Sequence, residues 1–274
     1  MTQDVEPSGE GKAEIPKPKP GRDWRSFGKE YVIVVLGVAT ALAAQQGADW
    51  LRWRSEVAQA RQIIAGEMAR NISYGIARMR QAACINSRLH EIEKILADAA
   101  RNGVLPPLGT LGGPPVVPWS SGAWESVVAS QTATHFPRQQ LASLSLSYAR
   151  VQRAENWNRQ EAQEWATLNR LSGPGRRFDA ALGAEWQKAL GTAAMLNTFI
   201  ANTSLYFIRD IQGQNLPFMA ADQRLMAEAK TEALNVNTCR PLSSVPAVSL
   251  TRFAPGRILE FESEVKRLPY GRRP

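Results

Sequence analysis

The stretch that decides the fold is Tyr31–Trp50, YVIVVLGVATALAAQQGADW. From Val32 to Ala44 it holds no charged side chain, and the Thr40 hydroxyl is its only polar side-chain group. A helix that crosses a bilayer needs about 20 predominantly apolar residues, although a buried core helix can have the same composition. Length and composition together therefore predict one transmembrane helix.

Tryptophan flanks the apolar stretch on both sides, with Trp24 before it and Trp50 and Trp53 at its other end. A helix over residues 24–50 would be roughly 39 Å long at 1.5 Å per residue. This length is about that of a bilayer with its headgroup layers, where indole rings prefer to lie. We therefore predict a membrane anchor over 24–50, with the three tryptophans at its interfaces.

Small residues recur four apart within this span. Gly37 pairs with Ala41, and Ala43 pairs with Gly47. Such spacing allows a second helix to approach closely, although alanine-rich spans also contain it by chance. The pattern favours association with a second copy or with another membrane protein.

The orientation of the span is predicted from the basic residues that flank it, which are Arg22, Arg25 and Lys29 before it and Arg52, Arg54 and Arg61 after it. The positive-inside rule applies best to a short tail such as residues 1–23. We therefore expect a single pass through an inner (plasma) membrane, with the N-terminus cytoplasmic and residues 51–274 outside the cytoplasm.

A signal peptide is the competing interpretation, because Ala41-Leu42-Ala43 resembles an A-x-A cleavage site. The region before its apolar core would then span residues 1–30 and contain acids as well as bases. We favour an uncleaved anchor because the helical pattern continues past this site. Both interpretations place the bulk of the chain outside the cytoplasm.

The motif KEYVIVVLGV at 29–38 is followed by Ala41-Leu42, a tryptophan and an arginine-rich helical stretch. Over residues 24–100 this arrangement resembles a family of uncharacterised bacterial membrane proteins. The resemblance implies a single N-terminal span that leads into an extracytoplasmic helical region. It implies no activity and no catalytic residues.

Helical patterns fill most of the remaining chain. Residues 50–101 lack proline, and their apolar residues recur at three- and four-residue steps up to Asn102-Gly103. Further helices are predicted at 122–131, from Pro137 to Leu171, from Arg177 to Ile211 and from Pro217 to Asn235, with no strand pattern before Ser249. We predict an all-α fold, with an antiparallel bundle over residues 51–235.

The segment 104–121 is rich in proline and glycine. A loop of this length is either functional and mobile or a crossover between helices, and we favour the crossover.

Both ends of the chain are rich in proline. Within residues 1–23, Pro16, Pro18 and Pro20 alternate with Lys17 and Lys19, and we predict a disordered cytoplasmic tail over 1–23. Residues 236–274 form a proline-containing tail, in which a short helix over 258–268 is predicted. From residue 240 onward the tail has seven bases against three acids, half of the net charge of +8. Because no segment interleaves bases with aromatics, we expect no nucleic-acid partner.

The two cysteines, Cys84 and Cys239, are the chain's only thiols. In an oxidising compartment an even count favours a disulfide. The bond would close a loop of about 155 residues, for which chain entropy gives a ceiling of about 5 kcal/mol. Two buried free thiols, or a bond between the Cys84 side chains of two copies, are the alternatives.

No catalytic or metal-binding motif is found. The two histidines, His90 and His135, lack a ligand cluster at metal-binding spacing, and no HExxH, GxSxG, Walker or GxGxxG motif is present. Glutamates follow two helices (Glu67, Glu91 and Glu93; Glu155, Glu161 and Glu164), but nothing in the pattern marks a buried pair. We expect no cofactor, no metal and no catalytic residue.

The expected function is therefore binding. A membrane-anchored helical scaffold or accessory subunit would associate with the membrane and with a second copy or another envelope protein. The alternatives are an exported enzyme and a ligand-sensing helical domain. Sensing is disfavoured because residues 1–23 are too few to form a cytoplasmic output module.

Overall fold

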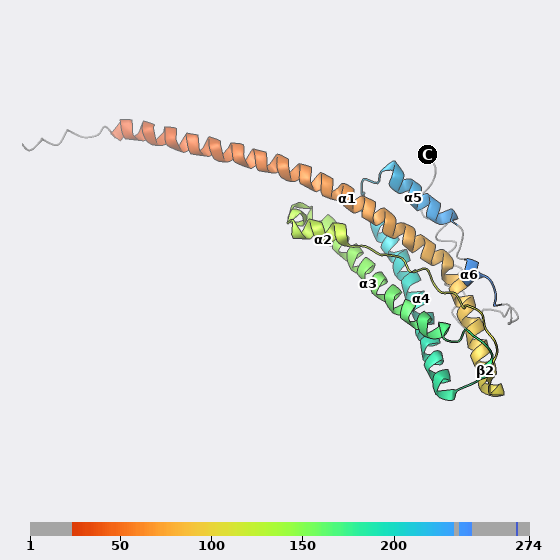
Figure 1. Ribbon diagram of the computed structural model, residues 1–274. Helices are drawn as coiled ribbons and strands as arrows, with labels where there is room; N and C mark the ends of the chain where they lie inside the picture. Colours follow the sequence, from red (N-terminus) through yellow and green to blue (C-terminus); the bar gives the residue numbers. More distant parts are fainter. Residues whose placement is uncertain (1–23, 233–235, 243–266, 268–274) are drawn as a thin grey trace, which may run out of the picture. The chain divides into compact units, whose positions relative to one another are not determined.

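The computed structural model describes residues 24–232, 236–242 and 267, and this part of the chain is mostly helical (Figure 1). The helices are α1 (Trp24–Asn102), α2 (Gly122–Ala129), α3 (Arg138–Asn169), α4 (Ala180–Gln212), α5 (Ala220–Thr231) and α6 (Val236–Cys239), with a 3₁₀ turn, η1, at Thr132–His135. The tail predicted at 1–23 and the helix predicted at 258–268, except Arg267, lie outside the described residues.

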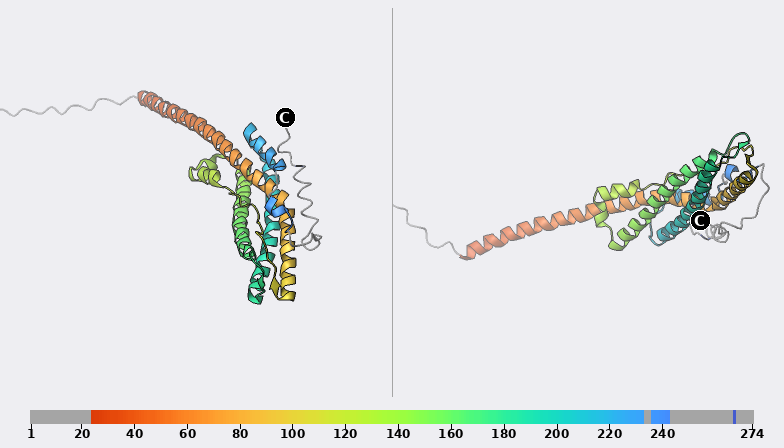
Figure 2. Two further views of the ribbon diagram at one scale, coloured as in Figure 1. Left: turned by 45° about the vertical axis from the view of Figure 1, so that its right-hand side comes forward. Right: turned by 90° about the horizontal axis from the view of Figure 1, so that it is seen from below.

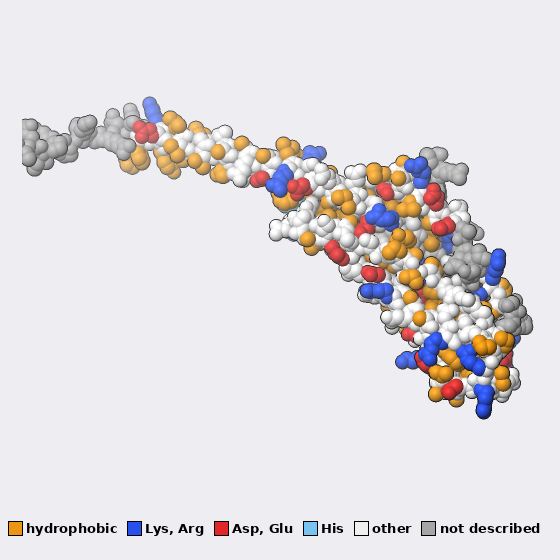
Figure 3. Space-filling view, viewed as in Figure 1, with side chains coloured by type: hydrophobic (Ala, Val, Ile, Leu, Met, Phe, Trp, Pro, Cys, Tyr) orange, Lys and Arg blue, Asp and Glu red, His pale blue; other side chains and the backbone are white. Residues whose placement is uncertain are grey.

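The chain divides into two units between Arg52 and Trp53, within α1. The first unit contains the apolar stretch of α1. Its large apolar side chains are exposed, for example Ile33 at 69% and Leu36 at 60%. In Figure 3 hydrophobic side chains cover this stretch between charged groups at its two ends.

Helix boundaries in the second unit follow local capping chemistry. Gly103, with φ of +71°, ends α1 in the left-handed conformation that glycine adopts readily. Asp179 caps α4 by accepting from the backbone N–H groups of Ala181 and Leu182 at 2.8 and 3.1 Å. The predicted start of this helix at Arg177 is therefore wrong by three residues.

Two strands of two residues each, β1 (Val104–Leu105) and β2 (Arg176–Arg177), pair in the antiparallel direction. The expectation of no strand before Ser249 is thus wrong at this one place. The pairing closes the end of the bundle, where the segment after α1 meets the segment before α4.

The helices of the second unit do not alternate in direction as predicted. Hydrogen bonds join Glu67 to Tyr148 and Arg78 to Glu161, so α3 runs parallel to α1. α4 runs antiparallel to both, as the ion pairs Arg150–Asp210 and Arg170–Glu185 show for α3, and α5 runs in the same direction as α1 (Figure 1). Of the consecutive helices, α3 and α4 are antiparallel with a short connection, and so are α4 and α5, whereas α1 and α3 form the parallel pair that the prediction missed.

The segment 103–121 explains the parallel pair, because it returns along the bundle before α2 begins. Buried side-chain amides donate to its backbone carbonyls, Asn71 to Ser120 at 2.8 Å and Asn158 to Val117 at 3.2 Å. Asn169 reaches Gly112 at 3.1 Å. The crossover interpretation of this proline- and glycine-rich segment thus agrees with the structure.

The core lies between the second half of α1, α3 and α4, which Figure 2 shows side by side from two further directions. One cluster of buried side chains surrounds Ile72 and Phe207, and the other surrounds Leu89 and Trp186. Because α5 and the crossover segment cover the other sides of α1, its residues 64–96 are buried on nearly every face.

Candidate functional site

One helix, near the N-terminus, is long and apolar enough to cross a membrane, and its apolar window is exposed throughout. Trp24 and Trp50 are 86% and 59% exposed at either side of this window. A Cβ atom placed on Gly37 or Gly47 would meet no atom within 4 Å, and Ala41 is exposed. The surface predicted to pack on another helix is therefore open.

Trp53, predicted as an interface anchor, belongs to the second unit. Its indole stacks on the His135 ring with a centroid distance of 3.7 Å and an interplanar angle of 18°. The contact joins α1 to the turn η1 and gives His135 a structural partner.

Cys84 of α1 and Cys239 of α6 form a disulfide within the chain. The residues that follow are also held on α1: the backbone N–H of Leu242 donates to Glu91 at 3.1 Å, and Arg88 donates to the carbonyl of Arg240. Residues 239–242 are therefore fixed to α1.

Glu67 has both carboxylate oxygens occupied. Oε1 accepts from the Ser120 hydroxyl at 2.7 Å and from the Ala123 N–H at 3.0 Å, and Oε2 accepts from the Tyr148 hydroxyl at 2.7 Å. Burial, followed by this bond, raises the pKa of Tyr148 well above its ordinary value. Glu67 thus joins α1, α2 and α3 through hydrogen bonds to both of its carboxylate oxygens.

Arg78 and Glu161 form an ion pair that is entirely inside the core. The Arg78 Nη2 atom lies 2.6 Å from both carboxylate oxygens, and the two side chains are 1% and 0% exposed. Desolvation lowers the pKa of Arg78 and raises that of Glu161, while their mutual attraction opposes both shifts. Because no ligand can reach the pair, it is a structural cross-link.

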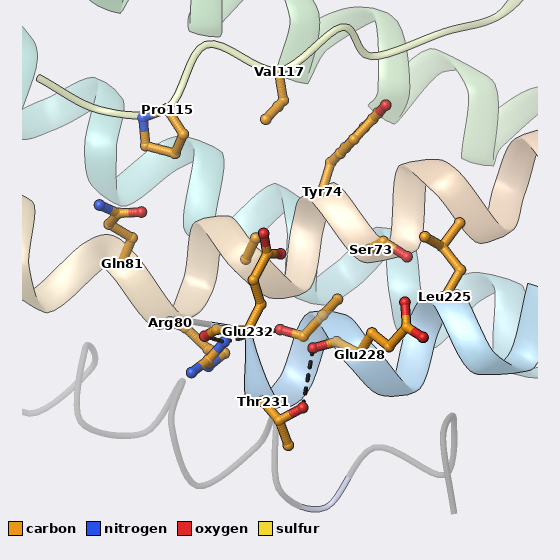
Figure 4. A pocket seen from close by; sticks show the side chains of 12 residues that line it. Ser73, Tyr74, Arg80, Gln81, Pro115, Val117, Leu225, Glu228, Thr231 and Glu232 are labelled. Atoms are coloured by element: carbon orange, nitrogen blue, oxygen red, sulfur yellow. Dashed lines mark hydrogen bonds between the residues drawn. The ribbon is translucent and has the colours of Figure 1, made fainter. Parts of the chain in front are cut away.

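A cleft lies between α1, α5 and the crossover segment, with a volume of about 730 Å³. Figure 4 shows Gln81 pointing from α1 toward Pro115, Glu232 rising from the residue after α5, and Glu228 lying along α5 toward Leu225. Arg80 closes one end by donating to the backbone carbonyls of Ala229 and Glu232 at 3.0 and 2.7 Å. The cleft thus combines apolar walls with a few polar groups.

This cleft could not be predicted from the sequence, because its walls come from segments more than thirty residues apart, around 73–81, 115–117 and 225–232. The buried charges of Glu67 and Glu161 were also missed. Both lie at helical spacing from apolar core residues, Glu67 three residues after Ile64 and Glu161 seven residues before Leu168, which was the available signal.

An exposed aromatic surface covers the outer side of α3 and α4. The surface, called here the α3/α4 aromatic face, consists of the exposed Leu146, Met195, Phe199 and Tyr206 and the half-buried Trp157. The Trp157 and Phe199 rings are 5.3 Å apart, and two arginine guanidiniums lie over the Trp157 and Tyr206 rings at 5.9 and 5.6 Å from the centroids.

Comparisons with known proteins identify no relative: no family model, no curated protein and no solved structure matches the chain. Within residues 24–232, 236–242 and 267, no group of three His, Cys, Asp or Glu side chains is arranged to hold a metal ion. The geometry of the molecule is therefore the basis of the functional argument.

Proposed function

We propose that this protein is a single-span membrane-anchored helical protein that acts by binding, as a scaffold or accessory subunit of an envelope complex. Residues 24–50 form the anchor, the N-terminus is cytoplasmic, and the bundle lies outside the cytoplasm. Membership of the bacterial family that residues 24–100 resemble is part of this proposal.

The anchor is supported by the exposure of the apolar stretch. Thirteen consecutive uncharged residues, Val32–Ala44, are exposed on every side. In water such a surface would favour aggregation, whereas a bilayer removes it from water at about 25 cal/mol for each Å² of apolar area. The Cys84–Cys239 bond supports a location in an oxidising compartment.

The observation that carries the binding function is the α3/α4 aromatic face. Phe199 is 41% exposed, and Met195 and Tyr206 are each 47% exposed. All three large apolar side chains belong to α4. Aromatic residues, methionine and arginine are the types enriched in the contact cores of protein interfaces. The face is therefore the surface through which we expect the bundle to bind a second copy or another envelope protein.

A photo-crosslinking experiment tests this function. A photoreactive phenylalanine analogue replaces Phe199 in the full chain, and Gln187, an exposed residue on the same helix, serves as the control position. We expect a discrete adduct in membranes from position 199 and none from 187. Equal or absent crosslinking at both positions would contradict the proposal.

A further inference from the structure

The cleft between α1, α5 and the crossover segment has the size of a small-molecule site. Its volume of about 730 Å³ lies within the range of about 300–1,000 Å³ that is typical of ligand pockets. Tyr74, Pro115, Val117 and Leu225 give it apolar walls. All lining residues belong to the second unit, so the cleft does not depend on the membrane anchor.

Gln81 in the wall of this cleft has a buried hydrogen-bond donor, the side-chain amide nitrogen, without an acceptor among the described residues. Its side chain is 4% exposed, and its amide Nε2 has no hydrogen-bond partner among the described residues. A buried amide N–H left without a partner destabilises the fold, because it has lost its hydrogen bond to water and gained no acceptor. A ligand carbonyl in the cleft would accept this bond and remove that destabilisation.

The charges of the cleft favour a cation. Two carboxylates, Glu228 and Glu232, line it against one guanidinium, Arg80. Arg80 is already bound to the last carbonyls of α5, whereas neither carboxylate takes part in an ion pair among the described residues. The two glutamates are exposed at the mouth, while Gln81 lies deeper.

We propose that the cleft binds a small organic cation, with an ammonium group on an apolar stem and a carbonyl at the other end. The ammonium group pairs with Glu232 at the mouth, where Glu228 adds a second negative charge, the stem contacts Leu225 and Val117, and the carbonyl accepts from Gln81. This site is separate from the α3/α4 aromatic face, which lies on other helices.

The probe for this site is N-acetyl-lysinamide, which carries an ammonium group, a four-carbon stem and two carbonyls. N-acetyl-norleucinamide is its matched control, because it keeps the backbone and an apolar stem and lacks the ammonium group. Binding to the full chain in detergent is measured by calorimetry or by ligand-observed NMR. We expect saturable binding of the lysine probe, with the norleucine probe bound about fivefold to tenfold more weakly.

Two variants locate the binding. The double substitution Glu228→Gln with Glu232→Gln should weaken binding of the lysine probe about fivefold to tenfold and bring it to the level of the norleucine probe. Glu185→Gln, whose carboxylate pairs with Arg170 at a distant end of the bundle, is the control and should bind as the unmodified chain does.

Gln81→Met replaces the buried amide with an apolar side chain of similar length. Because the amide Nε2 has no hydrogen-bond partner among the described residues, we expect the melting temperature to stay equal or rise while both probes bind more weakly. Unsaturable binding of the lysine probe, equal affinity for the two probes, or unchanged affinity in the Glu228/Glu232 variant would each overturn the proposal. The glutamate variant keeps the test decisive even if Gln81→Met does not fold, since both glutamates are exposed.

Discussion

The buried pair Arg78–Glu161 gives the most quantitative prediction. Replacing Glu161 with leucine leaves the Arg78 guanidinium charged inside the core, where its Nε and Nη1 atoms already lack hydrogen-bond partners. Removing one partner of a buried pair costs about 3–5 kcal/mol, because an uncompensated charge remains. We therefore expect Glu161→Leu to lower the free energy of unfolding by about that amount.

The double variant Arg78→Met with Glu161→Leu should recover this loss. Apolar replacement of a whole buried pair is often neutral or stabilising by about 1–4 kcal/mol, and the two unpartnered arginine atoms are removed with it. The double variant should therefore be at least as stable as the unmodified chain, within about 1 kcal/mol.

Urea unfolding of the full chain in detergent, followed by tryptophan fluorescence, measures these differences. Glu155→Gln is the control, since its pair with Arg159 is exposed and 3.8 Å long, and it should change stability by less than about 1 kcal/mol. A cost below about 1 kcal/mol for Glu161→Leu would refute the reasoning. So would a double variant as unstable as the single one.

Three further changes test other parts of the bundle by the same unfolding assay. Reducing the Cys84–Cys239 bond should destabilise the chain by up to about 5 kcal/mol, whereas reductant should not alter the stability of Cys239→Ser. The pKa of Tyr148 is raised in the folded state, so above a pH of about 10 the folded chain keeps a proton that the unfolded chain loses. The free energy of unfolding should therefore fall as the pH rises above about 10. Tyr148→Phe should make that fall shallower by about one proton, and an unchanged slope would contradict the assignment. Asp179→Ala should cost about 1 kcal/mol by removing the α4 cap, with Asp179→Asn close to neutral.

Much of the secondary structure could be predicted because its signals are local. The apolar run near the N-terminus, the glycine that ends α1 at 103 and the proline before α3 each act within a few residues. The α4 start was misplaced although Asp179, a typical capping residue, stood two residues beyond the predicted boundary.

Helix direction could not be predicted because it depends on distant contacts. The composition of segment 103–121 indicates a loop, but its course along the bundle is fixed by Asn71, Asn158 and Asn169, whose amides bind its carbonyls. The cleft follows from that course, since Pro115 and Val117 form one of its walls.

The buried charges escaped prediction for a related reason. A charged residue on a helix normally indicates the solvent-facing side. Between residues 64 and 96, however, other segments cover α1 on nearly all sides, so Glu67 and Arg78 are buried. The apolar periodicity of one helix does not show how many other segments pack around it.

The most direct test of the central claim combines membrane extraction with thiol labelling of the full chain in a bacterial host with a permeabilised outer membrane. We predict that the protein resists carbonate extraction and that Cys84 and Cys239 react with a membrane-impermeant thiol reagent only after reduction and unfolding, with the inner membrane intact. Release by carbonate, or labelling that requires opening of the inner membrane, would contradict an anchored bundle outside the cytoplasm.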